Sequence, residues 1–129
     1  MKRNVAKWVI LLGAAVLVIG SARAGMRAAD PVTLGGGWAS GNLGQARASD
    51  NYNEAIGCYL FSYTDFVYID CIGRDGAGNS LTCFSSNPNF IAAVQASAGD
   101  SYIAFHVDDN GGCDMMQVTN SSVFAPKEP

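Results

Sequence analysis

Cysteines at positions 58, 71, 83 and 113 limit the folds that are open to this chain of 129 residues. An even number of cysteines in a small exported domain usually forms disulfides. A zinc site is the alternative, but the chain has no Cys-x-x-Cys pair and its single histidine is not at ligand spacing from any cysteine. We therefore expect two disulfides, each of which restricts the unfolded chain. Four cysteines can form two disulfides in three ways. The sequence does not choose among these pairings of Cys58, Cys71, Cys83 and Cys113.

Residues 1–24 have the pattern of an export signal. A basic start is followed by an apolar run over residues 8–19 and by small residues at 22 and 24, as signal peptidase requires. The run is shorter than the roughly 20 apolar residues that span a bilayer, which disfavours an uncleaved anchor. Its short, alanine-rich form resembles a bacterial export signal. The sequence thus predicts a secreted or periplasmic protein with no membrane contact after signal cleavage.

Removal of this leader leaves a distinctly acidic chain. The formal charge of the whole chain is −3, but residues 1–24 hold four of the eight basic residues and none of the eleven acidic ones. Residues 25–129 therefore carry −7. Charge repulsion disfavours nucleic acid and anionic lipid as partners, whereas cationic proteins and metal ions are compatible with this charge.

The remaining sequence predicts one domain between two less ordered ends. Residues 25–36 contain small residues, glycine and proline without periodicity, and we expect them to form a flexible lead-in. Residues 37–124 are expected to form a single disulfide-linked domain, and residues 125–129 a loose tail. Segment 37–49 suggests an irregular first strand anchored by Trp38.

Three segments in the middle of the chain predict an antiparallel meander. Residues 54–62, 66–72 and 79–85 are rich in β-branched and aromatic residues and are separated by short turns. A two-residue connection at Thr64-Asp65 would place Cys58 opposite Cys71. Reversal about Ala77 would then place Cys83 opposite Cys71, so that these three cysteines share one face.

A helix and a second hairpin are expected to follow. Asn87 is a favourable N-cap, Pro88 suits the first helical position, and Gly99 marks the expected end. Three apolar residues at helical spacing are expected to pack this helix on the sheet: Phe90, Ile91 and Val94.

The second hairpin contains a conflict over Cys113. Segments 101–107 and 113–118 alternate as strands do, and Asn110-Gly111 between them is a strong turn signal. A two-residue turn there would place Cys113 on the face opposite Phe105, so either the loop carries a bulge or this cysteine belongs to another layer. The fold class that follows is α+β: an antiparallel sheet of five or six strands, sandwich-like in one alternative, with one packed helix and two disulfides.

Six aromatic residues of the meander are predicted to share the face opposite the cysteines. If exposed, they would suit stacking on sugar rings or contact with a protein, because tyrosine and phenylalanine give a large, rigid contact area. The alternative, which we favour from sequence alone, is a second core covered by the helix or by the Trp38 strand. The residues are Tyr59, Phe61, Tyr63, Phe66, Tyr68 and Phe84.

Two further groups of residues contain side chains that could bind a metal or transfer a proton. Oxygen ligands cluster at Asp108, Asp109, Asn110 and Asp114, but the spacing is not that of an EF-hand, and an acidic turn is the simpler interpretation. His106 has a carboxylate two residues on, at Asp108, that could orient it as a base. No nucleophile elbow or metal-ligand pair accompanies it, so we expect neither a catalytic residue nor a cofactor.

The chain contains the segments ARASDNYNEAIGC, CIGRDGAGNSLTC, SNPNF, DSYIAFHVDDNGGC and TNSSVFAPK. Together they resemble small exported bacterial proteins of unknown function with a similar four-cysteine pattern. This resemblance implies export and disulfides but no activity. The function expected from the sequence is a non-enzymatic binding or interaction module for a protein or a carbohydrate. An inhibitor or effector that acts on a cationic enzyme is the alternative, and a small hydrolase the least favoured option.

Overall fold

The computed structural model of the chain describes residues 28–124. The predicted signal 1–24 and tail 125–129 lie outside them. In this part of the chain no helix is long and apolar enough to cross a membrane. The elements are β1 (Thr33–Gly35), β2 (Trp38–Asn42), α1 (Leu43–Ala48), β3 (Ala55–Ser62), β4 (Val67–Arg74), β5 (Ser80–Ser85), α2 (Pro88–Gln95), β6 (Tyr102–Val107) and β7 (Cys113–Thr119).

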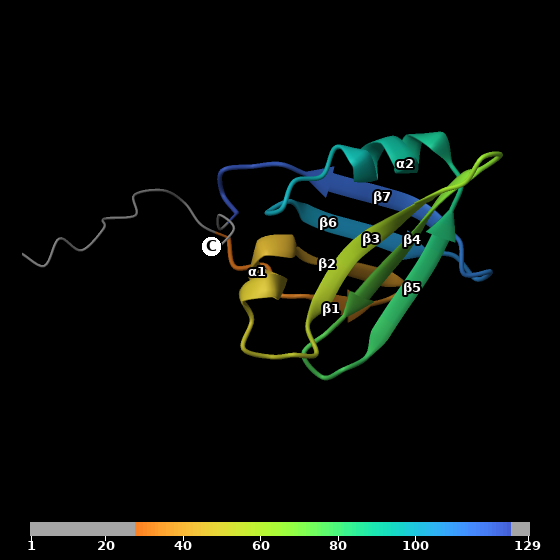
Figure 1. Cartoon of the computed structure of the whole chain (residues 1–129). Coiled ribbons are helices and arrows are strands. Elements are labelled where there is room, and N and C mark those ends of the chain that lie inside the picture. Colours follow the sequence, from red (N-terminus) through yellow and green to blue (C-terminus); the bar gives the residue numbers. More distant parts are fainter. Residues whose placement is uncertain (1–27, 125–129) are drawn as a thin grey trace, which may run out of the picture.

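The strands form two antiparallel sheets that pack against each other (Figure 1). One sheet has the order β1-β2-β6-β7 and the other the order β3-β4-β5. The α+β class, the antiparallel pairing and the sandwich-like arrangement are confirmed. The described residues hold seven strands rather than five or six, because a short strand, β1, pairs with β2 at the edge of the larger sheet.

The core lies between the two sheets. Its most deeply buried side chains come from both of them, with Ile69 of β4 at 0%, Phe105 of β6 at 0% and Ala39 of β2 at 0% exposure. The sheets approach closely at Gly73 of β4, where a Cβ atom would lie 2.6 Å from the Cβ of Ala39. A glycine is needed at this crossing because no side chain fits there.

The meander has the register that the turn predicts. The backbone N–H of Tyr63 donates to the carbonyl of Phe66 at 2.8 Å, which closes a two-residue turn at Thr64-Asp65. Because this turn sets the pairing, Cys71 of β4 lies opposite Cys58 of β3 and opposite Cys83 of β5.

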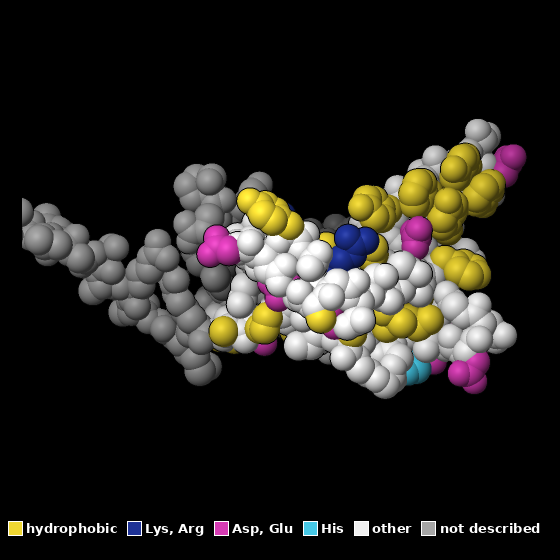
Figure 2. All heavy atoms as spheres, turned by 90° about the horizontal axis from the view of Figure 1, so that it is seen from below, with side chains coloured by type: hydrophobic (Ala, Val, Ile, Leu, Met, Phe, Trp, Pro, Cys, Tyr) yellow, Lys and Arg dark blue, Asp and Glu magenta, His cyan; other side chains and the backbone are white. Residues whose placement is uncertain are grey.

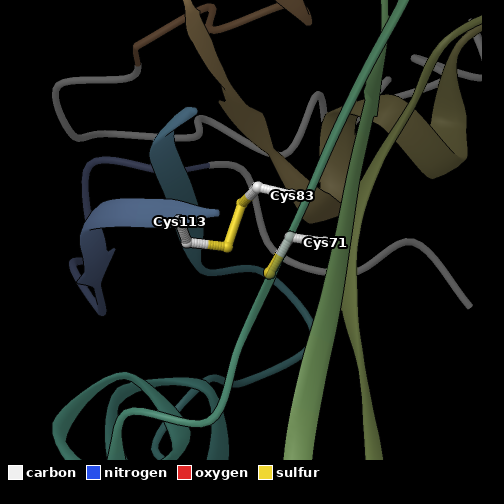
Figure 3. Close-up of side chains that lie close together, drawn as sticks. All are labelled: Cys71, Cys83 and Cys113. Atoms are coloured by element: carbon white, nitrogen blue, oxygen red, sulfur yellow. A yellow bond between two sulfur atoms is a disulfide. The ribbon is translucent and has the colours of Figure 1, made fainter. Parts of the chain in front are cut away.

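Two disulfides are present, as expected, and their pairing is now defined. Cys58–Cys71 joins the neighbouring strands β3 and β4, and Cys83–Cys113 joins the two sheets. Figure 3 shows the second bridge with the Cys71 sulfur directed toward it. The sulfur atoms of Cys71, Cys83 and Cys113 lie within 4.8 Å of one another, so the disulfides lie side by side in the core.

A bulge resolves the conflict over Cys113. The pairing of β6 with β7 shifts between His106, which lies opposite Met115, and Val107, which lies opposite Cys113. Asp114 is the extra residue. Because one residue is inserted, Cys113 shares the inner face with Val107 and reaches Cys83.

The amino-terminal part of the domain differs from the prediction. The described part of the lead-in, residues 28–36, contains β1 and the buried side chain of Val32. This segment is therefore part of the domain, because Val32 contributes to the core. Segment 37–49 is not one irregular strand: β2 ends at Asn42, and α1 follows it.

Asn42 explains this change from strand to helix. Its side-chain Oδ1 accepts from the backbone N–H of Gln45 at 2.8 Å, and its Nδ2 donates to the carbonyl of Asp100 at 2.7 Å. An asparagine followed three residues later by glutamine is a signal for a helix start, and it could have identified α1 from the sequence. The second helix starts at Pro88 as predicted but ends at Gln95, before Gly99.

Candidate functional site

Six aromatic side chains share the outer face of the β3-β4-β5 sheet, and we call this surface the aromatic face. Phe61 lies opposite Tyr68, while Tyr59 and Phe84 lie on either side of Asp70. The remaining two residues flank the turn of the β3–β4 hairpin. The aromatic face comprises Tyr59, Phe61, Tyr63, Phe66, Tyr68 and Phe84.

The aromatic face is exposed, so the interpretation as a second core is wrong. Five of its six side chains are among the exposed large hydrophobic residues: Tyr59 at 63%, Phe61 at 36%, Tyr63 at 53%, Phe66 at 57% and Phe84 at 60%. Figure 2 shows hydrophobic side chains gathered on the projecting end of the molecule. In Figure 1 this end is the tip of the β3–β4 hairpin, which extends past α2.

Neither expected cover lies over the aromatic face. Helix α2 does pack on the core, as predicted, through Phe90, Ile91 and Val94. It contacts β7 of one sheet and β4 of the other, so it closes the side of the sandwich instead. Trp38 lies on the outer face of the other sheet, opposite His106, and is itself 41% exposed.

The rings near the hairpin tip form an ordered stack. Ring centroids lie 4.9 Å apart for Phe61 and Tyr68 and 4.6 Å apart for Tyr63 and Phe66, with interplanar angles of 15° and 16°. The pKa of Tyr68 is raised from its ordinary value, first by desolvation among these rings, then by the neighbouring Tyr63 and the Asp70 carboxylate.

An acidic residue that the sequence analysis did not single out lies within the aromatic face. Asp70 is exposed and occupies the row between Tyr59 and Phe84. In Figure 2 an acidic side chain is visible among the hydrophobic ones. Alternation from Tyr68 to Asp70 along β4 was the sequence signal that could have placed this carboxylate on the same face.

A hollow adjoins this row at the open edge of β3. Its volume is about 250 Å³. Its lining consists of residues 55–59 of β3 and Ile72 of β4. Among these, Gly57, Tyr59 and Ile72 lie on the outer face, beside Asp70. Gly57 has no side chain to fill the space.

The weak metal candidate does not form a common site. Asp108 accepts the backbone N–H groups of Asn110 and Gly112 through Oδ1, both at 2.8 Å. Asp114 instead contacts His106. The two carboxylates therefore have separate partners: Asp108 and Asn110 belong to the turn, whereas Asp114 lies in β7 beside His106. Among residues 28–124 the sole cluster of three potential metal-ligating His, Cys, Asp or Glu side chains consists of disulfide-bonded cysteines.

The carboxylate that orients His106 is Asp114 and not Asp108, which the sequence offered as a candidate. His106 Nδ1 lies 2.7 Å from Asp114 Oδ1, because the bulge in β7 brings Asp114 next to the ring. Trp38 packs against the same ring, with centroids 5.0 Å apart. These two contacts fix the orientation of the His106 ring.

No family model, curated protein or solved structure matches this chain. The resemblance to small exported bacterial proteins therefore stays a prediction.

Proposed function

We propose that this protein is an exported, non-enzymatic binding module and that the aromatic face is its binding surface. The observation that carries the proposal is the exposure of that face. Contiguous apolar patches on single-chain proteins commonly mark interaction sites. The exposed surface of these rings has an unfavourable hydration free energy, which burial against a partner would remove.

The support beneath the aromatic face suits binding. The β3–β4 hairpin carries five of the six rings, and Cys58–Cys71 links its two strands on the opposite side of the sheet. Tyrosine and phenylalanine have few rotatable bonds, so their ordering costs little entropy. A surface that is already ordered gains affinity because less freedom is lost on association.

Site-specific photocrosslinking in the cells that produce the protein tests this proposal. A benzophenone amino acid replaces Tyr63 in the aromatic face, and in a matched control it replaces the exposed Gln117 of β7 in the other sheet. We expect a discrete adduct of higher mass from position 63 and none from position 117. Absence of an adduct at position 63, or the same adduct from both positions, would refute the aromatic face as the binding surface.

A second candidate is an inhibitor or effector of a cationic enzyme, and the charge distribution favours it. Residues 28–124 contain ten acidic residues and two arginines. Within this range the contact of His106 with Asp114 is the one acid–base pair. Such a negative field accelerates association with a positive partner and is screened by salt. A complex whose association rate is independent of salt would exclude this candidate.

A further inference from the structure

One row of the aromatic face combines two rings and one carboxylate. Tyr59, Asp70 and Phe84 are direct cross-strand neighbours on three adjacent strands. Two strand spacings of about 4.8 Å each separate the backbones of Tyr59 and Phe84, so about 10 Å lie between them. This gap admits one planar group between the two rings, above the carboxylate.

The carboxylate of Asp70 has no basic partner among the described residues. The basic residue on the same face is Arg74, four residues along β4 and about 13 Å away by strand rise, and the two form no ion pair. The surrounding charge is also negative, with a formal −8 over residues 28–124. A positive group from outside thus finds an attractive field and an unpaired acceptor.

We propose that Tyr59, Asp70 and Phe84 form a binding site for an arginine or lysine side chain of a protein partner. This inference rests on the proposed function and names the chemistry of the partner. The cation lies between the two rings, where the negative faces of the aromatic systems attract it. Asp70 accepts its N–H groups in a charge-assisted hydrogen bond.

The hollow beside this row accommodates the rest of the side chain. The aliphatic stem of arginine or lysine lies over Ile72 and the half-buried backbone of Gly57, and the charged end reaches Asp70. Such a division between an apolar stem and a charged end is usual for these side chains. Arginine fits better than lysine, because its planar guanidinium stacks on rings and bonds a carboxylate in two places.

A peptide titration followed by NMR tests the site. The probe is a capped five-residue peptide with one arginine between alanines, and its neutral twin carries citrulline, which has the same shape without the charge. A third peptide carries lysine in place of the arginine. We expect the arginine peptide to shift the amide resonances of Tyr59, Asp70 and Phe84, and the lysine peptide to shift them less. The citrulline peptide should leave them unchanged.

Two variants with the same change in charge distinguish a site from a general field. Asp70→Asn removes the proposed acceptor, whereas Asp50→Asn removes a charge from the exposed α1–β3 loop, at the far end of β3. We expect Asp70→Asn to weaken binding about fivefold. Asp50→Asn should weaken it less than about twofold, because screening acts over about 8 Å at physiological salt. Phe84→Leu keeps an apolar side chain and should weaken binding about threefold, through loss of the ring.

The outcomes separate this inference from the proposed function. Binding of the citrulline peptide as tightly as the arginine peptide, or equal losses in Asp70→Asn and Asp50→Asn, would overturn the cation site. Absence of peptide binding would also overturn it, and an adduct at position 63 would still support the aromatic face. Superimposable amide spectra of the free variants exclude misfolding as the cause of any loss.

Discussion

At the scale of single residues, the turn between β4 and β5 shows how one carboxylate organises a connection. Asp75 Oδ1 accepts the backbone N–H groups of Ala77 at 3.0 Å and Asn79 at 2.9 Å, and Oδ2 accepts from the Asn79 side chain at 3.0 Å. These bonds favour the charged form, with the Asn79 side chain as the largest cause, so the pKa of Asp75 lies below its ordinary value.

This lowered pKa gives a pH prediction. Because the folded pKa is below the unfolded one, Asp75 contributes stability above its ordinary pKa of about 3.9, and this contribution is lost as the pH falls through the lowered value. Asn79→Ala should raise the pKa of Asp75 and reduce this acid-dependent loss. Titration of the Asp75 carboxyl carbon by NMR measures the shift, and identical midpoints in both proteins would contradict the assigned cause.

At the scale of elements, the crossing of β4 over β2 leaves no room for a side chain at Gly73. A Cβ at Gly73 would also lie 3.2 Å from Leu34 Cδ2. The flexible side chain of Leu34 can move aside. The Cβ of Ala39 cannot, because it is bonded directly to the backbone of β2. The distance between the two sheets is therefore set by a pair of very small residues.

Gly73→Ala should lower the free energy of unfolding by about 1–3 kcal/mol, the usual cost of overpacking a core. Gly35→Ala in the edge strand β1 is the matched control, because a Cβ there meets nothing within 4 Å. The control should be neutral, or stabilising by up to about 1 kcal/mol through reduced freedom of the unfolded chain. Urea unfolding measures both, and an undiminished stability of Gly73→Ala would show that the sheets can separate.

The pairing of the strands could be predicted from the sequence, but the packing of the sheets could not. The Thr64-Asp65 turn fixed the strand register and thereby the shared face of six aromatic residues. Alternation shows which side chains share a face but not which face meets the other sheet, and so the exposure of that face was mispredicted. The pairing of Cys83 with Cys113 depends on a bulge at Asp114, and a bulge follows from tertiary pairing rather than from the local pattern.

At the scale of the whole molecule, the disulfides differ in what they connect. Cys58–Cys71 closes 13 residues within a hairpin, and Cys83–Cys113 closes 30 residues and ties the two sheets together. In the chain-entropy model, loops of these sizes correspond to about 3 and about 3.6 kcal/mol of stabilisation. Cys113 and Cys83 are also more buried than Cys58.

Paired alanine variants should therefore rank in a fixed order. The Cys83→Ala, Cys113→Ala double variant is expected to lose more unfolding free energy than the Cys58→Ala, Cys71→Ala double variant. Its loss combines released chain entropy with a cavity in the core. Denaturant unfolding of the two proteins provides the comparison, and the reverse order would show that the sheets hold together without their covalent link.

The alternation of side chains along β3 and β4 also separates two kinds of evolutionary constraint. Inward positions such as Ile56, Ile69 and Cys71 are tied to the interior, and each substitution there has a cost in folding. Outward positions such as Tyr59, Phe61 and Asp70 are exposed to solvent. Substitutions at every second position of this hairpin can therefore change its outer surface, while the positions between them keep the inner packing unchanged.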